Sequence, residues 1–294
     1  MAEQDKALEF TGERFTPECV REIRYEHWHR YAFALAVARG KRVLDAACGE
    51  GYGSNLLAGV AEHVTGVDIS VEAIEHARTR YGDRGNLQFH DGDAAQLAFA
   101  DKSFDVVVSF ETLEHLLAQQ ALVAGFARVL ADDGILLISS PDKHTYSEVA
   151  GFRNEFHVRE LYREELLDLL RPHFNGIRLY GQKLLFQSML WTLDGSGEGA
   201  AMQTVDADGK VSPGLDYAPL YFVAVCAKQE LPADLPRLSS FGDREESVYS
   251  HYNGEVRRNM SAGARIAELE AEIDRLRTST RITPSSRWPR WLRR

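Results

Sequence analysis

Two patterns of apolar residues alternate along this chain. Short apolar runs, which are typical of buried strands, occupy residues 41–45, 63–68, 87–90, 105–110 and 135–140. Other segments repeat apolar residues at helical spacing, at 21–38, 54–61, 71–81, 118–130 and 163–170. Because strands that alternate with amphipathic helices form βαβ units, the pattern predicts a doubly wound α/β fold with a mostly parallel sheet covered on both faces.

Two further apolar runs, at 176–181 and 220–227, predict the last strands of the sheet. They are separated by residues 182–219, which are rich in Gly, Asp and Ser. A connection of that length inside a compact domain is usually functional or disordered. We therefore expect residues 1–228 to form one domain, with 182–219 as an insertion and 8–38 as an N-terminal lid.

The C-terminal part of the chain has a different pattern. Residues 229–260 contain Pro232, Pro236 and many charges, and indicate a linker. Over 261–280 the apolar residues follow the 3-4-3 spacing of a short coiled-coil helix, which predicts self-association. These residues are Ile266, Leu269, Ile273 and Leu276.

The tail over 281–294 combines two tryptophans and a leucine with five arginines and no acid. Indole rings favour the membrane–water interface, and basic residues are attracted to anionic lipid. Pro289 prevents a long regular helix here. The tail therefore predicts an anchor to an anionic membrane surface or a docking peptide for a partner enzyme. A solvated end without a partner is the third alternative.

The overall composition limits the class of protein. The formal net charge of −10 argues against a nucleic-acid binder, because phosphate binding depends on clustered Lys and Arg. The cysteines, Cys19, Cys48 and Cys226, do not form a disulfide framework. The sequence has neither a secretory leader nor an apolar run of about 20 residues. We expect a cytoplasmic protein, with peripheral attachment to the inner face of the membrane as an alternative.

The most informative segment is a glycine loop at 43–53, between a strand and a helix. Gly49 and Gly51 allow close approach, and N–H groups at the helix start suit an anion such as a methionine carboxylate. The third glycine of the dinucleotide fingerprint is replaced by Ser54, which argues against a nicotinamide-dependent oxidoreductase. Asp45 ends the strand before the loop, where it can hold an ammonium group indirectly.

Acids also lie at the ends of the next two strands. Asp68 ends the second strand, where a carboxylate can accept both hydroxyls of a ribose. After the third strand, Asp93 can accept from an adenine amino group while the Ala94 N–H meets a ring nitrogen. Because the carboxyl ends of parallel strands share one edge of the sheet, these residues predict a site for adenosine.

Four motifs follow one another at the intervals seen in class I methyltransferases, which this chain resembles over residues 8–228. They are Gly12–Phe15, Ala47–Gly53, Phe110–His115 and Phe156–Val158. The resemblance implies S-adenosyl-L-methionine as the cofactor and a seven-stranded sheet with an antiparallel last strand. It also implies cofactor contacts from Ala47, Ile69 and Phe110. Arg14 can clamp the cofactor carboxylate if residues 8–20 fold back as a lid. The motifs are similar to those of bacterial members associated with surface-polysaccharide assembly.

The segment Glu111–His115 follows the fourth strand at the switch point of the sheet, where ligands bind. The i, i+3, i+4 spacing of Glu111, Glu114 and His115 predicts that they share one face of a helical turn. One interpretation makes His115 the general base, with Glu114 setting its tautomer. A second rests on resemblance to the Glu-x-x-Glu-His of quinone-biosynthesis O-methyltransferases, which implies a divalent cation at the acceptor oxygen. The third leaves both as helix-start residues.

We expect the chain to transfer a methyl group from S-adenosylmethionine to a hydroxyl of a sugar or cell-surface glycan precursor, covered by residues 182–219. His144, Tyr146 and His157 follow the fifth strand and can hydrogen-bond this acceptor. A small aromatic or quinone-like metabolite is the alternative acceptor. An alternative of another class is a non-catalytic binding or scaffold module on a methyltransferase fold.

Overall fold

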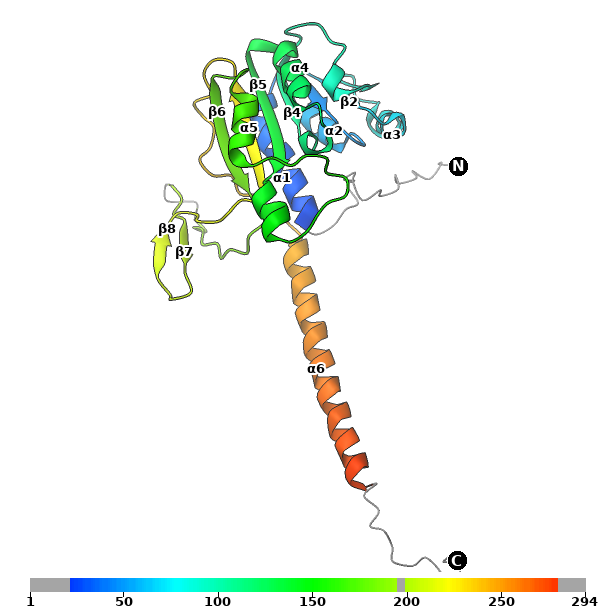
Figure 1. Cartoon of the computed structure of the whole chain (residues 1–294), viewed down its shortest axis with the longest axis vertical. Helices are drawn as coiled ribbons and strands as arrows, with labels where there is room; N and C mark the ends of the chain where they lie inside the picture. The colour runs from blue at the N-terminus through cyan, green and yellow to red at the C-terminus, as the bar shows by residue number, and fades with distance from the viewer. Residues whose placement is uncertain (1–21, 195–198, 280–294) are drawn as a thin grey trace, which may run out of the picture. The chain divides into compact units, whose positions relative to one another are not determined.

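The computed structural model describes residues 22–194 and 199–279. Within these residues the main feature is a seven-stranded sheet in the order β3-β2-β1-β4-β5-β9-β6, which confirms the predicted doubly wound fold (Figure 1). Its strands are β1 Arg42–Ala46, β2 His63–Asp68, β3 Leu87–Asp91, β4 Phe104–Ser109, β5 Leu130–Pro141, β6 Gly176–Gln182 and β9 Tyr221–Ala227. The helices of this unit are α1 Glu22–Ala38, α2 Tyr52–Ala58, α3 Val71–Tyr81, α4 Gln119–Val129 and α5 Arg163–Leu170.

The direction of the strands agrees with the expected topology. Strand β1 pairs in parallel with β2 and β4, and β4 pairs in parallel with β5. Strand β9 is antiparallel to both β5 and β6. Because β6 therefore runs in the same direction as β5, the chain leaves β6 at the carboxyl edge of the sheet, on the side where cofactors bind in such folds.

Both faces of the sheet are buried, which explains the continuous apolar runs of its strands. Adjacent residues of β1 show this clearly, because Val43 packs into one core and Leu44 into the other. The first core contains residues of α1, α2 and α3. The second contains residues of α4 and α5. Helix α3 illustrates the local signals: Ser70 accepts a hydrogen bond from the Ala73 N–H at its start, and Gly82 follows its last residue.

The insertion between β6 and β9 contains a short hairpin, β7 Gln203–Val205 and β8 Val211–Pro213, which the sequence did not predict. Ahead of the hairpin, the insertion exposes a group of large apolar side chains. They are Phe186, Met189, Leu190, Trp191 and Leu193. Contiguous apolar patches on a protein surface often bind a ligand or a partner, so these side chains are candidates for such a contact.

The expected linker at 229–260 has a different form in the structure. Its first part packs on the unit that contains the sheet, because Leu235 joins the core and its carbonyl accepts from Arg178. Its second part is helical, since α6 covers Ser247–Ser279 and not only 261–280. The added turns carry Val248, Tyr252, Val256 and Met260 at helical spacing, a pattern that the prediction of a linker overlooked among the charges. Local ion pairs such as Arg258–Glu255 also support these turns.

The chain divides into two compact units, residues 1–241 and 242–294. The sheet and its helices belong to the first unit, and α6 belongs to the second. No helix among residues 22–194 and 199–279 is long and apolar enough to cross a membrane. The expected membrane or partner-binding tail at 281–294 lies outside the described residues.

Candidate active site

The backbone turns sharply where β1 and β4 end. Ala47 and Glu111 have φ angles of 63° and 51°, which L residues rarely adopt. Each such residue costs on the order of 1–3 kcal/mol, and such costs concentrate at functional sites. In the loop after β1, Gly51 has a φ of 89°, and a Cβ at this position would lie 2.7 Å from the Phe89 ring. The loop therefore requires glycine here for both conformation and space.

Asp68 holds this loop and keeps hydrogen-bonding capacity for a ligand. Its Oδ2 accepts from the Gly49 N–H at 2.8 Å, and its Oδ1 accepts from the Ser70 N–H at 2.9 Å. A carboxylate offers about four lone-pair sites, so these bonds leave room for two ribose hydroxyls. The neighbouring Ile69 is 75% exposed, which provides an apolar surface for a base. These features fit the cofactor contacts expected at both residues.

Asp93 lies at the end of β3 and begins the short helix η1, Ala94–Gln96. Its Oδ1 accepts from the Ala95 N–H at 2.8 Å, and its Oδ2 accepts from the Gln96 amide at 3.0 Å. Ala94 itself is buried. A pocket of about 570 Å³ is lined by Asp93 and also by His115. It therefore connects a predicted adenine contact with the predicted catalytic residue.

Asp45 is fully buried beneath the glycine loop. Its carboxylate accepts hydrogen bonds from Ser54 Oγ at 2.6 Å and from the Tyr31 hydroxyl at 3.1 Å. Burial raises the pKa of Asp45 to about 7, although both hydrogen bonds act in the opposite direction. Because Asp45 is fully buried, it could reach a cofactor ammonium group only through an intervening group, and this contact stays a prediction. Phe110 is also buried and packs edge-on against Tyr31, with ring centroids 5.1 Å apart.

The expectation that Glu111, Glu114 and His115 share one helical face is wrong for Glu111. The helical turn after β4 is η2, Leu113–His115, and Glu111 precedes it with a positive φ that interrupts the helical path. Its Oε1 instead accepts from Ser139 Oγ at 2.7 Å and lies 3.3 Å from Nη1 of Arg30.

Arg30 is a buried residue of the site that sequence reasoning missed. Only 2% of it is exposed, and its Nε donates to Gln182 Oε1 at 2.7 Å. Its guanidinium also lies 4.5 Å from the centre of the Tyr221 ring. The available sequence signal was the pair Glu26 and Arg30, two opposite charges one helical turn apart in α1.

His115 is oriented by a backbone carbonyl. Its Nδ1 lies 3.0 Å from the Phe156 oxygen. Because a carbonyl oxygen can only accept, Nδ1 carries the proton of the neutral ring and Nε2 keeps the lone pair. Nε2 lies 3.9 Å from Glu114 Oε1, too far for a hydrogen bond. The carbonyl of Phe156, and not Glu114 as predicted, therefore sets the tautomer.

Glu114 is a buried carboxyl group whose two oxygens have no hydrogen-bond partner. Burial, followed by repulsion from Glu111, raises its pKa well above the usual range. Buried polar groups are almost always paired, so an unpartnered carboxyl beside a histidine marks a place for a ligand.

His157 reaches the site from a distant segment because the Glu114 carbonyl accepts from the N–H groups of Val158 and Arg159, at 2.8 and 3.0 Å. Its ring centre lies 5.1 Å from that of His115. Its Nδ1 donates to Glu160 at 2.5 Å. Glu114, His115 and His157 each offer one ligand atom within 4.8 Å of the others, a set that can hold a divalent metal ion.

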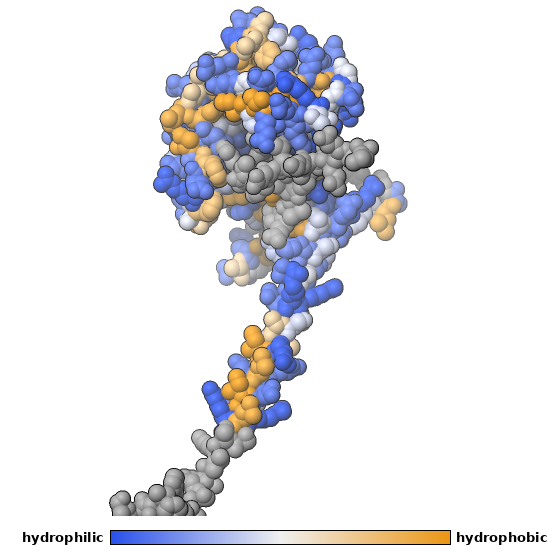
Figure 2. Space-filling view, turned by 90° about the vertical axis from the view of Figure 1, so that its right-hand side faces the viewer, coloured by the Kyte–Doolittle hydropathy of each residue, from blue (hydrophilic) through white to orange (hydrophobic). Residues whose placement is uncertain are grey.

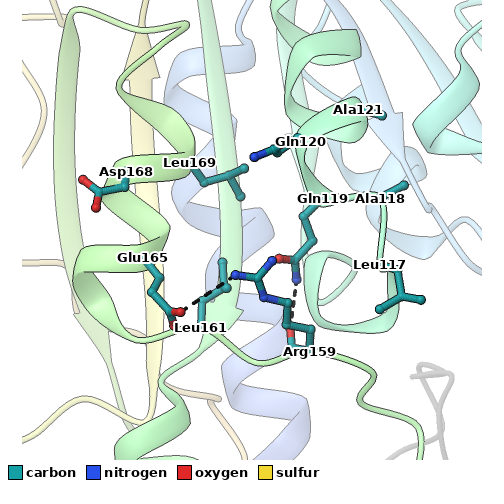
Figure 3. A pocket seen from close by; sticks show the side chains of 10 residues that line it. All are labelled: Leu117, Ala118, Gln119, Gln120, Ala121, Arg159, Leu161, Glu165, Asp168 and Leu169. Carbon is teal, nitrogen blue, oxygen red and sulfur yellow. Dashed lines mark hydrogen bonds and ion pairs between the residues drawn. The ribbon is translucent and has the colours of Figure 1, made fainter.

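A second pocket, of about 560 Å³, lies between α4 and α5 (Figure 3). Gln119 joins its two sides, because its amide donates to the carbonyls of Leu113 and Arg159, each at 2.8 Å. Figure 3 also shows Arg159 directed toward Glu165, at 3.8 Å. These contacts hold η2 against the segment that carries His157. Arg14, expected to clamp the cofactor carboxylate, lies outside the described residues.

Comparison with known proteins gives the family of the central part of the chain. Residues 44–138 match the family model described as "Methyltransferase domain". A probable S-adenosylmethionine-dependent methyltransferase of Mycolicibacterium smegmatis is 39% identical over 167 residues, which cover 56% of this chain and 64% of the relative. An O-methyltransferase of Penicillium expansum, cnsE, is 38% identical over 140 residues, 46% of each chain. The chain thus spans less than two thirds of the length of these relatives.

The fold has relatives among solved structures. The YcgJ protein of Bacillus subtilis superposes with a TM-score of 0.50 at 19% identity, covering 69% of this chain and all of that one. At this identity the likeness concerns the fold alone. The glycine loop, the acid at the end of β2 and the strand order agree with the family match, and none of the comparisons links the chain to polysaccharide assembly. Residues 44–138 therefore belong to the class I methyltransferases, which use S-adenosylmethionine as the methyl donor.

Proposed function

We propose that the whole chain is an S-adenosylmethionine-dependent O-methyltransferase that acts on a hydroxyl of a small aromatic or quinone-like metabolite. The observation that carries this proposal is the pocket that Asp93 and His115 both line. It puts a residue expected to contact the adenine and a histidine of defined tautomer on one continuous surface. The relative from Penicillium expansum, an O-methyltransferase, supports oxygen as the methylated atom.

His115 would act as the general base. When bound, the cofactor supplies a methyl group on a sulfonium, which is a good leaving group. Nε2 of His115 would accept the proton of the acceptor hydroxyl as that oxygen takes the methyl group, and the sulfur would leave as a neutral thioether. The Phe156 carbonyl stabilises the imidazolium that results, because Nδ1 already donates to it.

The acceptor would be partly apolar. The chain leaves β6 at the carboxyl edge and then exposes the apolar group around Leu190 and Trp191. Such side chains suit an aromatic ring or a hydrocarbon tail better than a bare sugar, whose hydroxyls need polar partners. A sugar or cell-surface glycan precursor stays a prediction from sequence resemblance.

The test is a search for the product followed by a variant. The protein is incubated with methyl-labelled S-adenosylmethionine and a metabolite extract, and mass spectrometry identifies the labelled product. We expect a methyl ether of an aromatic or quinone-like compound. With that acceptor, His115→Gln should lower kcat about 10²–10⁴-fold with little change in cofactor affinity. His63→Gln, at the opposite edge of the sheet, is the matched control. Near-normal turnover in His115→Gln would show that another group takes the proton.

A second mode of catalysis is supported by the cluster of Glu114, His115 and His157. The unpartnered carboxyl of Glu114 and the two imidazoles are nitrogen and oxygen donors of the kind that hold Zn²⁺, Mn²⁺ or Fe²⁺. A bound divalent ion would polarise the acceptor oxygen and lower the pKa of its hydroxyl. Glu160, which accepts from Nδ1 of His157, would orient that ligand.

Chelation distinguishes the two modes. If a metal ion takes part, EDTA abolishes turnover, a divalent ion restores it, and elemental analysis finds metal in the purified protein. His157→Gln should then lose both metal and activity, whereas His63→Gln keeps both. Full turnover in EDTA, with no metal detected, would contradict the metal mode and leave His115 as the base.

A further inference from the structure

Helix α6 carries an apolar stripe whose side chains are exposed. Every side chain that the structure describes from Val256 to Thr278 is exposed. The stripe consists of Ile266 (56% exposed), Leu269 (41%), Ile273 (47%) and Leu276 (59%). In Figure 2 the apolar side chains of the helix gather along its C-terminal half. An exposed apolar stripe on a helix favours a partner helix that buries it.

The residue types along the stripe favour a particular partner. In heptad notation Ile266 and Ile273 occupy a positions, and Leu269 and Leu276 occupy d positions. β-Branched residues at a with leucine at d favour two parallel strands. One heptad earlier, the a position is Asn259, and a single buried asparagine fixes register and restricts the assembly to two helices.

The flanking charges are complementary to those of a second copy of this chain. In a parallel, in-register pair, Arg265 at position g faces Glu270 of the partner subunit at position e. One heptad later, Glu272 faces Arg277 of the partner subunit. Both contacts join opposite charges. An unrelated helix would need the same pattern by coincidence, whereas a second copy always has it.

An antiparallel pair of the same helices is less favourable. Aligning the four apolar layers in that orientation puts Ile266 opposite Leu276 of the partner subunit. Asn259 would then lie beyond the described end of the partner helix and lose its asparagine counterpart. Only the parallel arrangement pairs Asn259 with Asn259 of the partner subunit, amide to amide.

We infer that the chain forms a parallel homodimer through the segment Asn259–Leu276 of α6. The inference does not depend on the proposed reaction, because α6 belongs to the second unit and none of the site residues lies on it. Each dimer would carry two methyltransferase units.

Sedimentation equilibrium of the full chain over a wide concentration range tests the inference. The wild type should approach twice the chain mass of 33.0 kDa as concentration rises. Replacing Leu269 and Ile273 together by Glu puts four like charges into the seam and should raise the dissociation constant at least tenfold. Replacing Ala267 and Ala271 by Glu adds the same charge to the outer face of the helix and should leave the dimer intact. Circular dichroism and cofactor binding would show that both variants are folded.

Oxidative cross-linking tests the orientation. Ala262→Cys and Leu276→Cys each place identical residues side by side at d positions of a parallel pair, so each variant should form a disulfide-linked dimer. In the antiparallel pair the two copies of position 276 would be about 15 Å apart along the axis and would not react. The parent chain controls for its native cysteines. A monomeric wild type, a seam variant as dimeric as its control, or failure of both cysteines to cross-link would overturn the inference.

Discussion

At the scale of single residues, Asp45 and Asp68 differ because their surroundings differ. Asp45 is fully buried and receives two side-chain hydroxyls, so it is suited to supporting the loop above it. Asp68 is only partly buried and receives two backbone N–H groups, one from each side of the strand end. The second arrangement leaves lone pairs of the carboxylate available, which is what recognition of two ribose hydroxyls would require.

Asp68→Ala should weaken cofactor binding. Two hydrogen bonds to neutral hydroxyls are worth about 0.5–1.5 kcal/mol each, so the Kd for S-adenosylhomocysteine should rise about tenfold or more. Calorimetry measures this, with Asp83→Ala as a control, since Asp83 is exposed in the turn after α3. An analogue without ribose hydroxyls separates this effect from loosening of the Gly49 loop, because it should bind the wild type and Asp68→Ala equally. Unchanged binding of S-adenosylhomocysteine would refute the assignment.

Asp45→Asn should change how stability depends on pH. The pKa of Asp45 is about 7 in the folded chain and near 3.8 when unfolded, so the folded state binds more protons between these values. The free energy of unfolding therefore decreases as pH rises through this window, by at most about 1.4 kcal/mol per pH unit, and the loss is complete above pH 7. Asparagine does not titrate, so Asp45→Asn removes this pH-dependent contribution to the free energy of unfolding.

Urea unfolding of both chains in the absence of cofactor provides the measurement. Relative to the wild type, Asp45→Asn should be more stable at pH 8 than at pH 5. Subtracting the two chains cancels the other titrating groups, which they share. A difference in unfolding free energy that stays constant between pH 5 and pH 8 would mean that Asp45 titrates normally.

At the scale of elements, hydrophobic spacing located the sheet and its helices well. The predicted ranges of β2, α3 and α5 equal those in the structure, because in each one the buried face is apolar and its ends carry turn or capping residues. The prediction failed at 229–260, where the charges and prolines favoured a linker although Val248, Tyr252, Val256 and Met260 follow helical spacing. It also failed at η2, since a positive φ at Glu111 cannot be read from a glutamate.

At the scale of the whole molecule, the strand order brings distant segments to one place. Arg30 of α1, Gln182 at the end of β6 and Tyr221 at the start of β9 meet at the carboxyl edge beside Glu111. The second unit contributes nothing to this set among the described residues. The proposed catalysis and the inferred dimerisation therefore involve separate parts of the chain, and we expect that each can be altered without the other.

The sequence by itself determined the fold class, the cofactor and the acids at the ends of β1, β2 and β3, because these depend on local periodicity and on a loop whose glycines have few alternatives. Only the tertiary structure decided the surroundings of His115. The carbonyl of Phe156 sets the tautomer of His115, and His157 approaches it from the same distant segment. Glu114 is buried beside them without a hydrogen-bond partner. Such contacts depend on how the segments after β4 and β5 pack against each other, and no local pattern encodes that packing.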